Sequence, residues 1–421
     1  MFNCNFRYRY LGLMSFVFSM TLVVLPAAAQ DHSGGHMMHG GHGGHGMIIK
    51  GVEKFSTTAY EGGPKTRPVD RRPPPAMTGN PVEGKILAFD RKKGRCLTCH
   101  IMGADTDQPG NVGPNLSSYG TQGRSEAEVF QQVWDARANN QDTMMPPFGT
   151  NDLLTEQEVI HIVSYLKTLK TPVPEPARPE ADDEISIFVA GEDLTMADIY
   201  IEQGEQVFKQ PGNNGRSCKS CHAPGKKKGP ELVGVAATYP KYDSNSERII
   251  SLEDRIGLCR DTYMNSDPYR LGSSNSNLLS SYVKFLSRRV PVNIVTDGPA
   301  ADAIERGKST FFKKTGQLNF SCADCHNKAG GKWLRGQELS IIKEGGVHSG
   351  TAPTWPRHFV AGHDLGLISL QQRIRHCQTV TRTNPLKLGS QEYTEMELYM
   401  TVLANGQPML APTKSKLRGE E

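Results

Sequence analysis

The chain has 421 residues, of which 37% are hydrophobic, and this length predicts roughly two to four domains. Lys and Arg number 48 against 44 Asp and Glu, a formal net charge of +4. So small an excess over this length excludes the strongly basic surface of a nucleic-acid-binding protein.

Residues 1–29 have the pattern of a secretory signal peptide. Arg7 and Arg9 precede an apolar run over residues 11–25, and three alanines that resemble a cleavage site follow at residues 27–29. The apolar run is too short to cross a bilayer comfortably, and no later stretch is long and apolar enough. We therefore expect a periplasmic protein with no stable membrane anchor; an uncleaved anchor is the alternative.

Residues 30–80 carry no periodic apolar face, and we expect them to lack packed structure. Residues 32–47 are rich in Gly, His and Met, and His and Met side chains can bind copper or another soft metal. A solvated tail with incidental metal affinity is the favoured interpretation, and copper binding is the alternative. Residues 64–81 are rich in proline, which predicts an extended spacer.

The sequence Cys-x-x-Cys-His occurs three times. Two thiols at this spacing can bond the vinyl groups of a haem, and the His that follows becomes an iron ligand. Zinc sites use the same Cys spacing but usually pair one such motif with a second, whereas each copy here heads a stretch of about a domain's length. We predict three covalently bound haem c groups, held by Cys96, Cys99 and His100, by Cys218, Cys221 and His222, and by Cys322, Cys325 and His326.

The first haem domain is predicted over residues 81–170. A helix near residues 83–89 leads into the motif, and a second helical pattern over residues 153–169 closes the domain. Thr155 is the predicted N-cap of the closing helix, and Glu158 completes a capping box.

The sixth iron ligand of this domain is predicted to be Met145. It lies some tens of residues after the motif and directly before a proline that restrains the loop, and Met/His ligation raises the reduction potential of a haem. Met144 is the alternative ligand. His161 lies within the closing helix, where a packing role is more common than ligation.

Residues 171–186 form a proline-rich linker, and two further haem domains, residues 187–290 and 291–421, are predicted to be an internal duplication. The second copy is longer by about 14 residues between its haem motif and its later Cys. The predicted fold is therefore mainly α-helical, with three tandem c-type cytochrome domains. The corresponding segments are Glu202–Phe208 and Glu305–Phe311, Ser251–Cys259 and Ser369–Cys377, and Leu271–Ser273 and Leu388–Ser390.

Two cysteines, Cys259 and Cys377, remain outside the motifs and the signal peptide. An even remainder in the periplasm usually forms a disulfide, but the two residues occupy equivalent places in the duplication. We therefore favour two thiolate iron ligands, which lower the reduction potential, over a single disulfide.

The two cysteines share a frame that begins with a capping serine. Arg373 precedes Cys377 by four residues and shares its helix face, so its charge can hold an anion beside the sulfur or lower the thiol pKa. Arg255 and Cys259 repeat this geometry. Arg375 and His376 add potential positive charge only at the second site, so we expect an anionic substrate to prefer Cys377.

These residues resemble the SoxXA cytochromes of bacterial sulfur oxidation, here fused in one chain. Residues 81–170 are similar to the SoxX subunit in the first haem motif, in Gly110–Asn115 and in Thr143–Gly149. Residues 187–412 are similar to a dihaem SoxA subunit in both Arg-Ile-x-x-Cys frames. The His- and Met-rich tail and the fusion depart from the separate subunits of that family.

The resemblance implies an L-cysteine S-thiosulfotransferase, which joins thiosulfate oxidatively to a cysteine of a SoxYZ-type carrier protein. Cys377 would form the sulfur intermediate, Arg373 would hold thiosulfate, and electrons would pass through haem to a small acceptor cytochrome c. Two alternatives stay open. One is a thiosulfate dehydrogenase that forms tetrathionate, and the other is a three-haem electron-transfer protein without sulfur chemistry.

Overall fold

The computed structural model describes residues 67–74, 76–104, 106, 108–177, 196–223, 229–344, 357–361 and 364–409. The predicted signal peptide, the Gly-, His- and Met-rich run and part of the proline-rich linker lie outside these residues. The described residues belong to one compact unit. None of their helices combines the length and the apolar character that crossing a membrane requires.

The first part of the described chain is helical and closes as the sequence predicts. Thr155 caps the closing helix α4 and forms the expected capping box with Glu158, and Ser125 forms another with Glu128 at the start of α3. The elements are α2 (Pro81–Phe89), η2 (Cys96–Thr98), η3 (Tyr119–Thr121), α3 (Glu126–Trp134), η4 (Ala136–Ala138) and α4 (Glu156–Thr168).

The middle part combines helices with one short antiparallel sheet, in which Lys241 pairs with Ile250 and Asp243 with Arg248. Ser251 and Asp254 form the capping box predicted for the helix that carries Cys259. The elements are α5 (Met196–Lys209), α6 (Cys218–His222), η5 (Val235–Thr238), β1 (Lys241–Asp243), β2 (Arg248–Ile250), α7 (Leu252–Met264) and α8 (Ser274–Leu286).

The last part carries two hairpins, β3–β4 and β5–β6, where the middle part has one. Both hairpins lie between the third haem motif and α10, where the longer second copy was predicted to carry its insertion, and Ser369 and Gln372 cap α10 as expected. The elements are α9 (Pro299–Phe312), η6 (Asp324–Lys328), β3 (Trp333–Leu334), β4 (Gln337–Glu338), β5 (Arg357–Ala361), β6 (Asp364–Ile368), α10 (Leu370–Val380) and α11 (Gln391–Val402).

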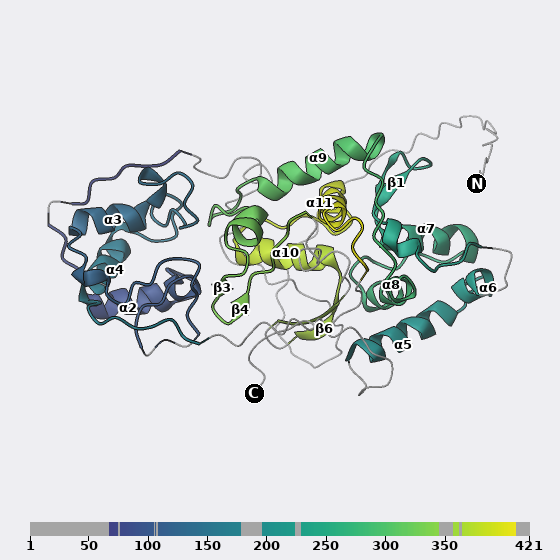
Figure 1. Ribbon diagram of the computed structural model, residues 1–421, viewed down its shortest axis with the longest axis horizontal. Helices are drawn as coiled ribbons and strands as arrows, with labels where there is room; N and C mark the ends of the chain where they lie inside the picture. Colours follow the sequence, from purple (N-terminus) through teal and green to yellow (C-terminus); the bar gives the residue numbers. More distant parts are fainter. Residues whose placement is uncertain are drawn as a thin grey trace, which may run out of the picture. The chain divides into compact units, whose positions relative to one another are not determined.

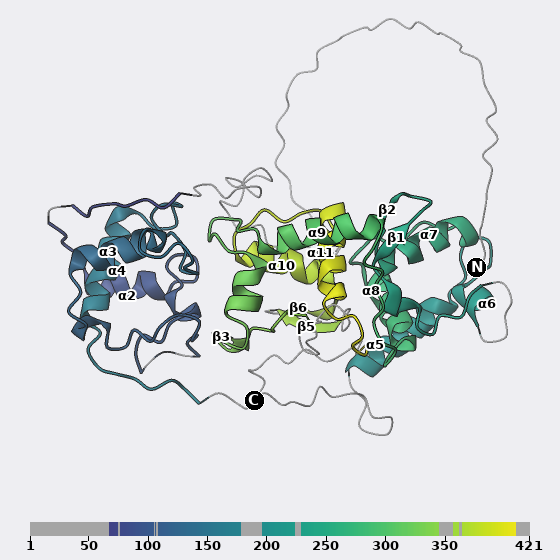
Figure 2. The same cartoon turned by 45° about the horizontal axis from the view of Figure 1, so that its top comes forward.

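Three pairs of helices cross closely at a glycine, namely α2 with α4, α5 with α8 (Figure 1) and α9 with α11 (Figure 2). In each pair, a Cβ atom added to the glycine would lie only 2.0–2.2 Å from a main-chain carbonyl oxygen of the partner helix. Only glycine permits so close an approach. A tyrosine four residues beyond that carbonyl packs against the same glycine in all three pairs. The contacts join Gly84 to His161 and Tyr165, Gly204 to Leu278 and Tyr282, and Gly307 to Glu395 and Tyr399.

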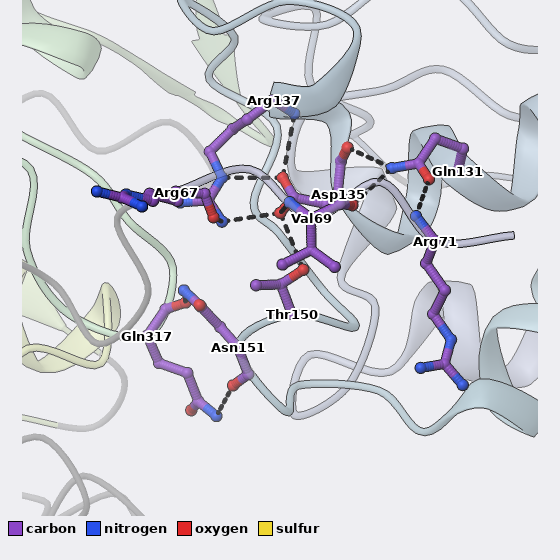
Figure 3. A network of polar contacts seen from close by, with 9 residues as sticks. All are labelled: Arg67, Val69, Arg71, Gln131, Asp135, Arg137, Thr150, Asn151 and Gln317. Atoms are coloured by element: carbon purple, nitrogen blue, oxygen red, sulfur yellow. Dashed lines mark hydrogen bonds and ion pairs between the residues drawn. The ribbon is translucent and has the colours of Figure 1, made fainter.

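A buried ion pair lies beside the loop of residues 143–150 that carries Met145, which we call the Met loop (Figure 3). Asp135 is 0% exposed and Arg137 is 4% exposed. The Arg137 Nε and Nη2 atoms donate to the two carboxylate oxygens at 2.8 Å each, a bidentate geometry. Thr150 Oγ1 and the Val69 amide donate to the same carboxylate at 2.9 and 3.0 Å. The network therefore ties residues 67–71 and the Met loop to the end of α3.

Asp135→Asn is expected to destabilise the protein by about 3–5 kcal/mol, because it leaves the buried Arg137 without its counter-charge. Burial opposes the ionised carboxylate, but the hydrogen bonds from Arg137, Val69 and Thr150 outweigh it and lower the pKa of Asp135. This stabilisation is therefore complete above about pH 4, the ordinary pKa of an aspartate, and is lost only as the pH falls through the lowered pKa.

The measurement is the midpoint of guanidinium unfolding, followed by circular dichroism at pH 7 for both variants of a matched pair. Asp70→Asn is the control, because Asp70 is exposed and its removal should cost less than about 0.5 kcal/mol. Equal midpoints for the two variants would contradict the role given to the buried pair.

Candidate haem centres and their cysteines

Local capping places each Cys-x-x-Cys-His motif at the start of a short helical turn. Ser217 forms a capping box with Ser220 around the second motif. In the third motif, the Ser321 amide and hydroxyl donate to Asp324 Oδ2 at 2.9 and 3.0 Å. The first motif begins instead after Arg95, whose backbone is left-handed with a φ of 48°. Each turn brings its two cysteines and its histidine to one side.

The three motif histidines share one hydrogen-bond arrangement. The Nδ1 atom lies 2.7 Å from the Pro114 carbonyl oxygen in His100, 2.8 Å from that of Pro230 in His222 and 2.8 Å from that of Ser340 in His326. A carbonyl oxygen only accepts, so Nδ1 carries the proton and Nε2 keeps its lone pair. Such a second hydrogen bond fixes the tautomer of a metal-ligating histidine. The residues therefore fit a haem iron.

Two of these histidines lie against a glycine that precedes the accepting proline. A Cβ on Gly113 would lie 2.2 Å from His100 Cε1, and one on Gly229 would lie 3.0 Å from His222 Cε1. The glycines therefore leave room for the rings. Our sequence analysis did not identify this role, although Gly-Pro-x-Leu occurs after both motifs.

The motif thiols lie in apolar surroundings. Burial is the main cause that raises the pKa of Cys96 and of Cys322 to about 12 and that of Cys99 and of Cys218 to about 11. Burial likewise raises the pKa of Cys325. The pockets thus suit the apolar faces of a porphyrin and disfavour free thiolates.

Cys259 lies beside the second motif. Burial raises its pKa, the charge of Arg255 lowers it, and the charge of Cys221 raises it; Cys259 in turn acts on Cys218. Arg255 Nη2 also forms an ion pair with Asp243 at 2.5 Å, and Asp243 is 6% exposed. Arg255 therefore acts on both Cys259 and the buried carboxylate.

Cys377 lies beside the third motif in the same way. Its charge raises the pKa of both Cys322 and Cys325. Burial lowers the pKa of His326, and the charge of Arg373 lowers it as well. Arg373 precedes Cys377 by one helical turn on α10. The structure thus brings Cys377, Arg373 and His326 together.

The expected positive charge of His376 is wrong. Burial, followed by repulsion from Arg373, lowers the pKa of His376 to about 4, so its ring is neutral at neutral pH. Arg375, by contrast, is exposed. The anion-attracting charge on α10 therefore comes from the arginines alone.

The structure places Met145 against the core of the first part. Its Sδ atom lies 3.7 Å from Gln132 Nε2. His161 uses both ring nitrogens within the protein, since Nδ1 lies 2.8 Å from the Asn80 amide and Nε2 lies 3.4 Å from Gln157 Nε2. The eight described cysteines form no disulfide, in agreement with separate roles for Cys259 and Cys377.

The mainly helical fold and the repeated histidine geometry define a c-type cytochrome, and comparison with known families agrees. A cytochrome c family model matches residues 82–170. A second model, described as SoxA/TsdA, cytochrome c domain, matches residues 203–292.

The relatives of known function identify the family. The L-cysteine S-thiosulfotransferase subunit SoxA of Pseudaminobacter salicylatoxidans is 34% identical over 216 residues, which cover 51% of this chain and 71% of that protein. The protein of the same name from Paracoccus pantotrophus is 31% identical over 210 residues, covering 49% of this chain and 67% of that protein. The chain therefore belongs to the SoxA family, as a SoxXA-type cytochrome.

Among solved structures, the crystal structure of SoxXA from P. pantotrophus matches 52% of this chain and 78% of its own chain. The sequence identity is 28% and the TM-score is 0.46, a score at which the structural match carries no argument of its own.

Proposed function

We propose that the protein is an L-cysteine S-thiosulfotransferase that joins thiosulfate to a cysteine of a SoxYZ-type carrier protein and passes two electrons to a small acceptor cytochrome c. The observation that carries this proposal is the convergence of Cys377 and Arg373 on the third haem motif. A sulfur nucleophile, a fixed cation and an electron acceptor are the three parts that oxidative conjugation of an anionic thiol requires. The names of the SoxA relatives support the same activity.

The proposed site residues follow from the three motifs. Each haem c would be held by its two motif cysteines and its motif histidine. The sixth iron ligand would be Met145 for the first haem, Cys259 for the second and Cys377 for the third. The proposed domains are residues 81–170, 187–290 and 291–421, joined by a linker over residues 171–186. The glycine and tyrosine contacts, equivalent in all three helix pairs, support a duplicated haem domain.

The bonds and electrons of the proposed reaction balance as follows with the residues present. Arg373 binds thiosulfate and directs its terminal sulfur to Cys377. A sulfur–sulfur bond forms between them, and two electrons leave. The haems supply the acceptors for these electrons. The thiolate of the carrier then attacks the terminal sulfur and takes the thiosulfate group as an S-thiosulfonate, and the Cys377 thiolate is the leaving group. No net proton is consumed between the two thiolates.

The second cysteine would have a different role. Asp243 pairs with Arg255 at 2.5 Å, so the arginine beside Cys259 is engaged by a buried carboxylate of the protein. We propose that Cys259 is an iron ligand only. Thiosulfate chemistry would therefore occur at one of the two equivalent cysteines.

The remaining proposals concern the parts outside the described residues. Export by a signal peptide over residues 1–29 would place the protein in the periplasm, where haem c attachment occurs. Residues 32–47, with their His and Met side chains, would bind copper. Neither proposal is needed for the reaction at Cys377.

The proposed function is tested by mixing the oxidised protein with thiosulfate, with and without the reduced carrier, while recording haem absorbance and the intact mass of the carrier. A thiosulfate adduct on the carrier, together with haem reduction that depends on the carrier, is the expected result. Haem reduction with tetrathionate in the absence of carrier would show a thiosulfate dehydrogenase instead. No response in either mixture would leave an electron-transfer protein.

Cys377→Ala is expected to lower the rate of carrier conjugation by on the order of 10³-fold or more, because it removes the nucleophile. The measurement is the initial rate of carrier adduct formation by mass spectrometry at saturating thiosulfate. Full conjugating activity in this variant would exclude the mechanism.

Arg373→Gln is expected to lower kcat/KM for thiosulfate by about 10- to 100-fold, the usual effect of removing a hydrogen bond from a charged group. Arg375→Gln is the matched control, because Arg375 is an exposed cation on the same helix, and its effect should be several times smaller. A thiosulfate dependence that is equal in the two variants would refute the anion-binding role of Arg373.

Met145→Ala is expected to lower the highest of the haem reduction potentials and to abolish the absorption band of Met–iron ligation, because a water or another weak ligand replaces the sulfur. Met144→Ala should keep both. The potentials are measured by spectroelectrochemical titration of the haem-loaded protein. If Met144→Ala lowers the potential and abolishes the band while Met145→Ala keeps both, the iron ligand is Met144.

A further inference from the structure

Two arginines from distant parts of the sequence meet between the first and third haem motifs. Arg95 immediately precedes Cys96, and its Nη1 atom donates to the Val380 carbonyl oxygen at 3.0 Å. Arg382 lies just beyond the end of α10, and its Nη1 atom donates to Gln317 Oε1 at 3.1 Å. The Nη2 atom of Arg382 donates to the carbonyl oxygen of Lys92. We call this contact between residues 92–95 and residues 380–382 the arginine junction.

The arginine junction lies where the two motifs approach each other. The Arg335 amide donates to the carbonyl oxygen of Thr98, within the first motif, at 3.2 Å. The charge of Cys99 also acts on Cys325 of the third motif. Asn151 and Gln317 exchange side-chain-to-backbone hydrogen bonds of 2.8 Å nearby, as Figure 3 shows. These contacts hold the arginines in a fixed position relative to both motifs.

Neither arginine has an acidic partner at ion-pair distance among the described residues. Both side chains are half-buried, and the buried Nε atom of Arg95 has no hydrogen-bond acceptor. Burial and then mutual repulsion lower the pKa of Arg95, and burial lowers that of Arg382, on which Asp90 acts in the opposite direction. An arginine stays charged despite such shifts, so two positive charges remain beside the first motif.

The third motif has charges of both signs. Asp324 lies between its two cysteines and is 1% exposed. The Nζ atoms of Lys328 and Lys314 lie 3.4 and 3.7 Å from its carboxylate oxygens. Both lysine side chains are more exposed than Asp324, so they neutralise its charge only partly. The buried carboxylate at the third motif thus has two lysines at ion-pair distance, whereas the two arginines beside the first motif have no acidic partner at that distance among the described residues.

We propose that Arg95 and Arg382 are positioning residues that fix positive charge beside the first haem, raise its reduction potential relative to the third, and so direct electrons away from the sulfur site. This inference rests on the proposed haems at the first and third motifs and deepens the proposed function. The step concerned would be the transfer of one electron from a haem held at the third motif to one held at the first. No bond or proton is involved.

The expected effect is large enough to measure. A unit charge at roughly 10 Å in a medium of effective dielectric about 20 changes a one-electron equilibrium by about tenfold. A tenfold change corresponds to 59 mV for one electron. Exposed charges at the same distance are screened by water and salt and contribute much less.

The test is a spectroelectrochemical titration of the full, haem-loaded chain in the absence of thiosulfate and carrier. Arg95→Gln and Arg382→Gln are each expected to shift the equilibrium between the first haem and the third about tenfold toward the third. Arg95→Lys, which keeps the charge, should leave the equilibrium close to that of the unaltered protein. Lys92→Gln is the matched control, because Lys92 is an exposed cation three residues away, and it should have little effect.

Two results would overturn the inference. One is an Arg95→Gln variant whose potentials equal those of the unaltered protein. The other is an Arg95→Lys variant in which the equilibrium between the haems shifts as far toward the third as in Arg95→Gln. The role of Arg95 would then lie in hydrogen-bond geometry and not in charge. The titration involves no thiosulfate, so it reports on the arginines even where conjugation fails. The Cys377→Ala assay in turn reports on conjugation whatever the potentials are.

Discussion

A hydrogen bond from an imidazole Nδ1 to a main-chain carbonyl oxygen constrains each motif histidine, and the rest of each haem centre is arranged around it. With the Nδ1 proton fixed at 2.7–2.8 Å from the carbonyl, only Nε2 can reach an iron. Glycines precede two of these carbonyls, and a Cβ there would lie 2.2 Å from the His100 ring and 3.0 Å from the His222 ring.

Cys259 and Cys377 lie beside their motifs because their helices begin at fixed points. Capping boxes at Ser251 and Ser369 set where α7 and α10 start, and the helix period then places an arginine and a cysteine on one face. The two frames are nearly identical up to this point. In the first frame, Asp243 pairs with Arg255, and the ligand-only role proposed for Cys259 rests on this pair.

Local patterns in the sequence predict these helices and the proximity of each cysteine to its own motif, because capping, helix period and motif spacing act over a few residues. The capping boxes at Thr155, Ser251 and Ser369 are confirmed. The expected charge of His376 is wrong because its burial depends on tertiary packing. The glycine crossings and the arginine junction were also missed, since both join residues far apart in the sequence. For the crossings, the repeated glycine and tyrosine were a usable signal, whereas nothing near Arg95 indicates Arg382.

The most direct test of this account is the electron paramagnetic resonance spectrum of the oxidised protein beside that of Cys377→Met. The account predicts two thiolate-ligated low-spin haems and one Met-ligated haem in the unaltered protein. The substitution should remove one thiolate signal and leave the signal of the Cys259 haem in place. A spectrum without thiolate ligation, or one that Cys377→Met does not change, would contradict the placement of the reactive sulfur on the third haem.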